Sequence, residues 1–323
     1  MPRPHAPRTR VSTYLSDWMP TGDARVSVAG YFGGGYDGTS FITGIDKIAF
    51  TADTKTVLSA VLNANNGLLA GMANSGVAGY FGGGYDGASY LSAIMKIAFT
   101  ADTKTTLSAT LTVGKFGLAG MSNNGVAGYF GGGYDGSYLD GIDKITFPAD
   151  TKTVLSAVLT AGVYVFASMS DFGVAGYFGG GSSSAAQLQR IDKITFPADT
   201  KTTLSATLTS TRQQLGAMAD SGVAGYFGGG YNSSTTYLNG IDKIAFPADT
   251  KTTLTATLTS ARSKLAGNSN SGVAGYFGGG EQSGGEVSGI DKIAFSTDTK
   301  STLSAVLTSA RASLASFADC GVF

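Results

Sequence analysis

One hexapeptide, Gly-Tyr-Phe-Gly-Gly-Gly, recurs six times along this 323-residue chain and limits its fold more than any other feature. Each copy continues into a run of the type Ile-Asp-Lys-Ile, then a Thr/Leu alternation, then a short apolar segment. Such short runs, separated by Gly, Asn, Asp or Pro, are typical of strands joined by turns. The tyrosines of the copies stand 48 to 50 residues apart, at Tyr31, Tyr80, Tyr129, Tyr177, Tyr226 and Tyr276. This regular spacing indicates a repeat protein whose units pack against their neighbours.

Four strands in a unit of about 49 residues match one blade of a β-propeller. In the fifth unit we expect them at residues 223–227, 241–244 and 252–258, and at 265–267 on the way into the next unit. A solenoid is the competing repeat fold, but its two terminal faces normally carry atypical capping repeats. Residues 313–322 align with an inner strand, and the first unit, from Val26, has no inner strand before it. We therefore predict an all-β, six-bladed propeller over residues 26–323, closed by the C-terminal strand.

Composition and charge narrow the class of protein further. Glycine accounts for 48 residues and charged residues for only 14%, which argues against disorder and against long exposed helices. The 22 basic residues balance 22 acidic ones, so no overall field attracts nucleic acid or an anionic membrane. The first 20 residues lack the apolar stretch of a signal peptide, and no apolar run approaches the length of a membrane span. We expect neither a membrane span nor a nucleic-acid partner.

The six copies agree at one end of the predicted ring and differ at the other. The end that we name the turn face carries the nearly constant turns between third and outer strands, together with the turns between inner and second strands. The third-to-outer turns contain residues 53–55, 102–104, 150–152, 199–201, 249–251 and 298–300. The opposite end, the loop face, carries the loops from outer to inner strands and the loops from second to third strands. The second-to-third loops contain residues 36–41, 85–90, 134–138, 182–187, 231–237 and 281–286. Variation at one end is expected if that end contacts an asymmetric partner, and equally if its loops drift neutrally.

Aromatic residues in the loops are the candidates for ligand binding. Tyrosine has an apolar ring and a polar tip, so it suits stacking on sugar rings or contact with an aromatic-rich protein surface. The alternative is that these rings pack on neighbouring loops. The aromatic candidates are Tyr36, Phe41, Tyr85, Tyr90, Tyr134, Tyr138, Tyr231 and Tyr237. At one equivalent position of the outer-to-inner loops stand Asn66, Lys115, Val163, Arg212, Arg262 and Arg311, and we add the three arginines as candidate ligand contacts.

The sequence offers little catalytic chemistry. The chain has one histidine, His5, which precedes the ring, so a catalytic triad has no general base within the repeats. Glutamate occurs only at Glu281 and Glu286, and eleven aspartates occupy repeated turn or strand positions that suit a structural role. Residues 33–38 match a dinucleotide-binding glycine pattern, but no helix follows. One carboxylate per loop falls far short of the roughly six to eight oxygens that calcium takes. We predict a protein that is not an enzyme, with no cofactor and no metal site.

Residues 1–25 differ in composition from the repeats. Proline at four positions keeps such a segment extended and unable to bury itself. We interpret it as an arm that docks onto a partner subunit. The alternative is that the arm folds back onto the ring. Its candidate docking residues are Arg3, Arg8, Arg10 and Trp18.

Three features of each unit together resemble the kelch family. They are a hydrophobic pair before a glycine doublet (residues 31–34), an apolar strand that ends in an aromatic residue (45–50), and an arginine before the inner strand at Arg212, Arg262 and Arg311. The likeness covers about residues 26–323 and implies a propeller of four-stranded blades. The outer-strand tryptophan of the usual kelch unit is absent, with Thr253 and Leu254 in its place, so the repeats are kelch-like. Copper oxidases with kelch blades use histidine ligands in the ring, which this chain lacks.

Near-identical glycine-rich units, with Phe-Gly-Gly-Gly followed by Ile-Asp-Lys-Ile, are similar to those of virion structural and tail-appendage proteins of tailed bacteriophages. That resemblance implies a non-enzymatic virion protein, assembled in the bacterial cytoplasm and bound to other virion proteins through its arm. The propeller would be displayed on the particle and would recognise a glycan or protein of the host surface. The alternative is a carbohydrate-binding, lectin-type propeller of bacterial origin, although lectin propellers carry the same site in every blade.

Overall fold

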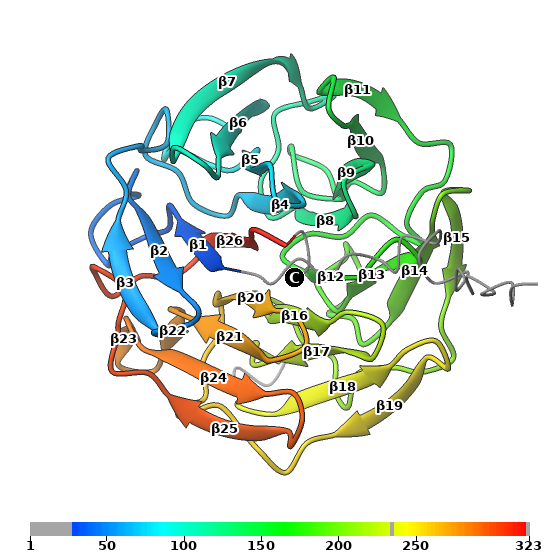
Figure 1. Cartoon of the computed structure of the whole chain (residues 1–323). Helices are drawn as coiled ribbons and strands as arrows, with labels where there is room; N and C mark the ends of the chain where they lie inside the picture. Colours follow the sequence, from blue (N-terminus) through cyan, green and yellow to red (C-terminus); the bar gives the residue numbers. More distant parts are fainter. Residues whose placement is uncertain (1–27, 233–235, 321–323) are drawn as a thin grey trace, which may run out of the picture.

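The computed structural model describes residues 28–232 and 236–320, which form six four-stranded antiparallel sheets around a central axis (Figure 1). The predicted all-β, six-bladed propeller is confirmed, and the described residues contain no helix. From blade 1 to blade 6, the inner strands are β26 (Ala315–Ala318), β4 (Ala70–Asn74), β8 (Ala119–Asn123), β12 (Ala167–Asp171), β16 (Gly216–Asp220) and β20 (Ala266–Asn270). The second strands are β1 (Ala29–Gly33), β5 (Ala78–Gly82), β9 (Ala127–Gly131), β13 (Ala175–Gly179), β17 (Ala224–Gly228) and β21 (Ala274–Gly278).

The outer half of each blade has a half-buried third strand and an exposed outer strand. In the same blade order, the third strands are β2 (Ile45–Ala49), β6 (Ala93–Ala98), β10 (Ile142–Thr146), β14 (Ile191–Thr195), β18 (Ile241–Ala245) and β24 (Ile290–Ala294). The outer strands are β3 (Thr54–Val57), β7 (Thr103–Thr110), β11 (Thr151–Val154), β15 (Thr200–Thr203), β19 (Thr250–Thr253) and β25 (Thr299–Thr302). In the last blade, a small hairpin of β22 (Glu281–Gln282) and β23 (Gly285–Glu286) stands between the second and third strands.

One expected strand is shorter than its sequence pattern suggested. We predicted an outer strand over residues 252–258, but β19 ends at Thr253. Beyond that point Leu254 and Leu258 still donate backbone hydrogen bonds to the carbonyl oxygens of Ile241 and Asn239. These two donors are four residues apart, whereas their acceptors are only two residues apart. The residues between the donors therefore lie outside the regular ladder.

The ring is closed by the C-terminal strand, as predicted. Strand β26 pairs antiparallel with β1, in a register that places Ala315 opposite Gly33 and Ala318 opposite Gly30. The fully buried Phe317 stacks on Tyr31 at a centroid distance of 5.1 Å and contacts Phe81 of the next blade at 4.6 Å. Closure therefore joins the last segment of the chain to blades 1 and 2 through both backbone and core contacts.

Neighbouring blades interlock where a side chain of one inner strand enters the space over a glycine of the next blade. A Cβ atom at Gly176 would lie 2.0 Å from the Sδ atom of Met121, so that position has no room for a side chain. The same methionine-to-glycine contact recurs from Met72, Met169 and Met218, and Phe317 fills the equivalent space over Gly79. The first glycine of each Gly-Tyr-Phe motif is thus explained by close packing between blades.

The sixth blade has Asn268 where four blades have methionine. Asn268 is fully buried, packs over Gly30, and makes no hydrogen bond through either amide atom. Because an unsatisfied buried amide is costly, we expect Asn268→Met to raise the free energy of unfolding by about 2 kcal/mol, as measured by urea denaturation. The matched control is Met218→Asn, which should destabilise the ring. An Asn268→Met variant less stable than the parent would contradict this account.

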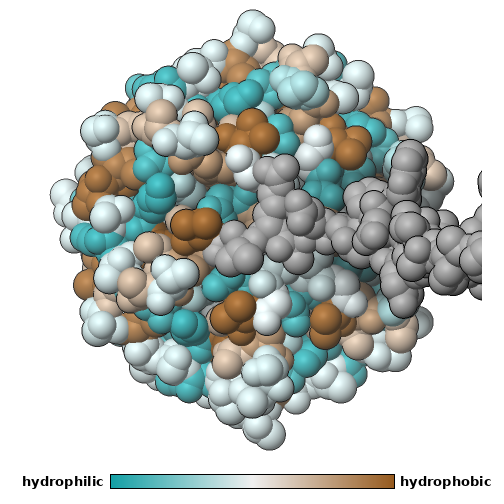
Figure 2. All heavy atoms as spheres, in the orientation of Figure 1, coloured by the Kyte–Doolittle hydropathy of each residue, from teal (hydrophilic) through white to brown (hydrophobic). Residues whose placement is uncertain are grey.

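Exposed apolar residues are scattered over the surface. Directly before each second strand stands a valine that is 48 to 59% exposed: Val28, Val77, Val126, Val174, Val223 and Val273. Outside the grey atoms, Figure 2 shows small brown patches separated by teal and white on the face in view. Apolar residues distributed singly are ordinary on a protein surface and do not mark a binding site.

Candidate functional site

On the turn face, each blade is latched to the next by three of the repeated residues. The hydroxyl of Tyr177 donates to Oδ1 of Asp249 in the next blade at 2.8 Å, and Lys193 Nζ lies 2.7 Å from Oδ2 of the same aspartate. The lysine ammonium also lies 5.2 Å from the centre of the tyrosine ring. Asp249 has a left-handed φ of 54°, which Asp tolerates better than most residues. We call this Tyr–Lys–Asp contact a latch.

The latch repeats at all six junctions between blades. Burial, reinforced by the aspartate, raises the pKa of each latch tyrosine far above its usual value. The constant residues of the turn face are therefore explained by contact between blades. The other five latches are Tyr31–Lys47–Asp102, Tyr80–Lys96–Asp150, Tyr129–Lys144–Asp199, Tyr226–Lys243–Asp298 and Tyr276–Lys292–Asp53.

The three arginines that we proposed as ligand contacts are buried inside the blades. Arg212, Arg262 and Arg311 are each no more than 3% exposed. Arg311 Nη2 lies 2.9 Å from Oδ2 of Asp46 on the third strand, and it also donates to the backbone oxygen of Phe32. Arg262 and Arg212 make the same ion pair with Asp291 and Asp242. The prediction was wrong for these residues. An arginine with no anionic partner would belong at the surface, but each of these three pairs with a buried aspartate.

In five of the six blades, the residue at this loop position follows the charge of the residue that faces it in the third strand. In blade 2 the third strand has Met95 in place of the aspartate, and the loop correspondingly has the neutral Asn66. In blade 3 the cation is Lys115, whose Nζ lies 3.2 Å from Asp143 Oδ2. In blade 4 the loop has Val163, and Asp192 is paired instead with Arg190 of the neighbouring loop at 3.4 Å. Charge compensation within each blade therefore accounts for differences that the sequence alone leaves open to ligand recognition.

The loop aromatics are brought together in blades 1 to 3. Phe41 of the first loop lies 5.7 Å from Tyr85 of the second, and Tyr90 of the second lies 6.4 Å from Tyr134 of the third, measured between ring centres. Within each loop the two rings are 5.4 to 5.7 Å apart. We name this continuous set the aromatic band; its members are Tyr36, Phe41, Tyr85, Tyr90, Phe116, Tyr134, Tyr138 and Tyr164.

Two members of the aromatic band were not among the candidates that we identified from the sequence. Phe116 lies 5.1 Å from Tyr90 and 5.6 Å from Tyr134, and Tyr164 lies 5.4 Å from Tyr138. Both belong to outer-to-inner loops, directly after the variable position at which we compared the copies. The signal was present one residue further along, where the six copies have Gly67, Phe116, Tyr164, Gln213, Ser263 and Ala312.

Tyr231 and Tyr237 form a separate pair in blade 5, with their ring centres 5.2 Å apart. The Tyr237 hydroxyl donates to Oε1 of Glu281 at 2.8 Å, and Lys264 pairs with the other oxygen of that carboxylate. Burial and the Glu281 carboxylate raise the pKa of Tyr237 to about 12. The loop face thus has a continuous set of aromatic rings at blades 1 to 3. On its other side it has an isolated tyrosine pair beside the Lys264–Glu281 ion pair.

At the centre of the loop face, six equivalent residues form a closed ring of backbone hydrogen bonds around the axis. The N–H of Leu68 donates to the carbonyl oxygen of Ser313, and that of Ser313 donates to the carbonyl oxygen of Lys264. The same bond repeats through all six blades, with N···O distances of 2.6 to 2.8 Å. All six residues, which also include Gly117, Val165 and Gln214, have a left-handed φ of 50 to 63°.

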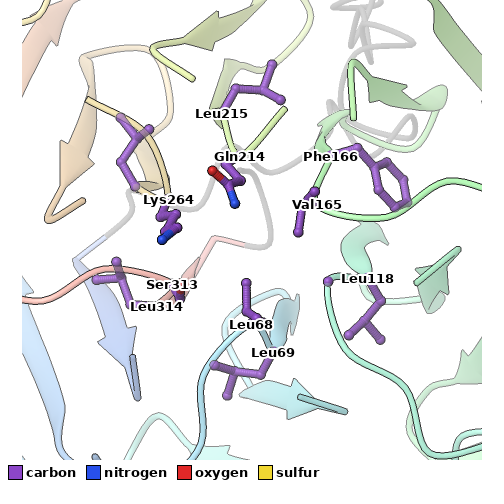
Figure 3. A pocket seen from close by; sticks show the side chains of 12 residues that line it. Leu68, Leu69, Leu118, Val165, Phe166, Gln214, Leu215, Lys264, Ser313 and Leu314 are labelled. Carbon is purple, nitrogen blue, oxygen red and sulfur yellow. The ribbon is translucent and has the colours of Figure 1, made fainter. Parts of the chain in front are cut away.

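The pocket inside this ring is small. It is polar on the side of Gln214, Lys264 and Ser313 and apolar on the side of Leu68 and Val165 (Figure 3). Its volume of about 70 Å³ is well below the roughly 300 Å³ at which small-molecule sites begin. We therefore place the candidate site on the aromatic band rather than in the central pocket.

The described residues contain no group of three or more His, Cys, Asp or Glu side chains that could hold a metal ion. No helix in the described part of the chain is long and apolar enough to cross a membrane. The proposed docking residues Arg3, Arg8, Arg10 and Trp18 lie outside the described residues.

No protein-family model matches the chain, and no curated protein matches its sequence. Among solved structures, that of YjhT matches with a TM-score of 0.64 and 12% sequence identity, covering 86% of this chain and 97% of the other. At this level of identity the likeness is one of fold. The chain is therefore similar to YjhT as a six-bladed β-propeller, and its function has to be argued from its own surface.

Proposed function

We propose that this protein is a non-enzymatic structural protein of a tailed-phage virion, displayed on the particle, whose loop face binds the host surface. The virion assignment is supported by the resemblance of its glycine-rich repeats to those of tail-appendage proteins. The binding assignment is supported above all by one observation, the aromatic band on blades 1 to 3.

The fold itself does not require an aromatic residue at the position of Phe116 and Tyr164. In every blade, the residue after the variable loop position forms a backbone bridge with the following second-to-third loop. Gly67, Gln213 and Ala312 make this bridge as Phe116 and Tyr164 do. Small and polar residues make this backbone contact equally well. The Phe116 and Tyr164 side chains are therefore available for recognition, for which aromatic residues are especially suited.

The polar groups of the repeats support a non-enzymatic role. The turn aspartates are held in the latches, and the third-strand aspartates are paired with cations and with threonine hydroxyls, as in the bond from Thr259 to Asp291. Catalytic carboxylates are normally perturbed groups in a cleft that substrate can reach. These carboxylates instead stabilise the blades.

A lectin-type propeller of bacterial origin is the second candidate. One observation favours it: the loops of blades 1 to 3 share a Tyr-Asp-Gly segment followed by a second aromatic residue, at residues 36–41, 85–90 and 134–138. This is a partial version of the site repetition that lectin propellers have. Labelling of intact particles with an antibody against the chain distinguishes the two candidates, because a bacterial lectin would be absent from them.

The recognition role predicts that Tyr85→Ala combined with Tyr90→Ala weakens binding of the labelled protein to host cells by about 2 kcal/mol. Both side chains lie in loops, so the melting temperature should change little. The control is Lys104→Ala with Lys201→Ala on the turn face, which should leave cell binding intact. A lower melting temperature with unchanged cell binding would show that the rings are packing residues and would refute the recognition role.

A further inference from the structure

We propose that the aromatic band consists of three equivalent subsites for a neutral linear polysaccharide, whose successive units contact blades 1, 2 and 3. This inference rests on the proposed binding role of the loop face and adds the chemical class of its ligand.

The three loops have the same local structure. In each, a tyrosine bridges to the second aromatic residue, as Tyr85 does to Tyr90. In each, the aspartate after that tyrosine accepts backbone hydrogen bonds through Oδ1, as Asp86 does from Ala88 and Ser89 at 2.8 and 2.6 Å. Asp37 and Asp135 make the corresponding turns in blades 1 and 3. Consecutive blades therefore present a similar pair of rings on a similar turn, with Phe41 in place of the second tyrosine in blade 1 and a loop one residue shorter in blade 3. Such a repeated pair suits a ligand that is itself periodic.

The subsites are joined into one surface. Phe116 lies within 6.0 Å of rings in both neighbouring loops, Tyr85 and Tyr134, and Tyr164 extends the surface beyond Tyr138. Contact between rings thus continues across the boundaries between blades. An extended chain can use such a surface along its whole length, whereas a single sugar would use one third of it.

The charges around the band favour a neutral ligand. Backbone hydrogen bonds lower the pKa of Asp37 and Asp86, so both are ionised at neutral pH. The cation nearest in sequence, Lys115, is buried and paired with Asp143. An acidic polysaccharide or a nucleic acid would meet repeated like charges on this side of the ring. A neutral sugar meets no such repulsion and can place its apolar faces on the rings.

The test is binding of the full chain to size-graded oligomers of several neutral polysaccharides, namely an α-glucan, a β-glucan, a mannan and a galactan, by titration calorimetry. We expect at least one series to bind, with an affinity that rises about 100-fold as the oligomer grows to span three blades and then levels off. Tyr90→Ala should weaken binding of the long oligomer about tenfold. The triple variant Phe41→Ala, Tyr90→Ala, Tyr138→Ala should abolish the dependence on length.

A second triple variant tests the charge argument without disturbing the turns. In Asp37→Asn, Asp86→Asn, Asp135→Asn, each amide oxygen can accept the same backbone hydrogen bonds. We expect neutral oligomers to bind within about threefold of the parent and acidic polysaccharides to bind measurably better. The control Lys201→Ala should bind all probes as the parent does.

Several results would overturn the inference. They are equal affinity for short and long oligomers, preference of the parent protein for acidic polysaccharides, or binding to none of the neutral series. If host-cell binding still depended on Tyr85 and Tyr90 in those cases, the proposed function would stand and its ligand would be another class, such as a surface protein. Loss of that dependence would refute the proposed function itself.

Discussion

Truncation of the chain after Arg311 is expected to open the ring and lower the free energy of unfolding by about 5 kcal/mol or more. The deletion removes β26, and with it the ladder to β1 and the fully buried ring of Phe317. Burial of a phenylalanine and the loss of several ladder hydrogen bonds together reach that value. It is comparable with the whole stability of many domains, which is about 5 to 15 kcal/mol. Thermal unfolding followed by circular dichroism measures the effect.

The truncated protein also provides its own control. A synthetic peptide of residues 312–323, added in excess, should pair with the exposed edge of β1 and restore part of the lost melting temperature. A scrambled peptide should not. The truncated chain should also aggregate more readily than the parent, because an unpaired strand edge is a template for association. An unchanged melting temperature after truncation would contradict the role of β26 in closure.

High pH is expected to destabilise the ring steeply. The six latch tyrosines have raised pKa values in the folded protein, whereas the unfolded chain ionises them near pH 10. Their contribution is therefore complete below about pH 10 and is lost as the pH rises above that value. Each tyrosine that stays protonated lowers the free energy of unfolding by about 1.4 kcal/mol per pH unit, so six together approach about 8 kcal/mol per unit.

Urea denaturation between pH 9 and 11 measures this slope, and absorbance at alkaline pH reports tyrosinate directly. Six of the 15 tyrosines should ionise only when the protein unfolds. In Tyr177→Phe the slope should be about one sixth shallower, although the lost bond to Asp249 lowers stability at neutral pH by about 1 kcal/mol. Ionisation of all tyrosines in the folded protein, with no loss of stability, would contradict the latch.

The blades and their closure could be predicted from the sequence because they depend on order along the chain. The repeated Gly-Tyr-Phe segment fixes the number of blades, and the unmatched segment at residues 313–322 fixes how the ring closes. The latches could not be predicted in this way. Tyr177 and Asp249 are 72 residues apart and meet only because their blades are adjacent. Their constancy was visible, but its cause lies in tertiary packing.

The candidate site was only partly predictable for a related reason. A loop residue such as Tyr90 can be recognised as exposed, and the structure leaves it 40% exposed. Arg311, by contrast, looks like a surface residue until Asp46 is placed beside it, 265 residues away in sequence. The neutral pair Met95 and Asn66 in blade 2 was the available clue, because it shows loss of both charges together.

The latch has an evolutionary consequence, since every blade offers a tyrosine and a lysine to its successor and an aspartate to its predecessor. Recombination between repeats can then exchange, duplicate or delete whole blades without creating a mismatched junction on the turn face. The binding loops move together with their blades, so new combinations of subsites arise in one step. Asn66 and Met95 must travel together in such an exchange, because separating them would bury an unpaired charge. The unit of inheritance for ligand specificity is therefore the blade together with the loop that leads into it.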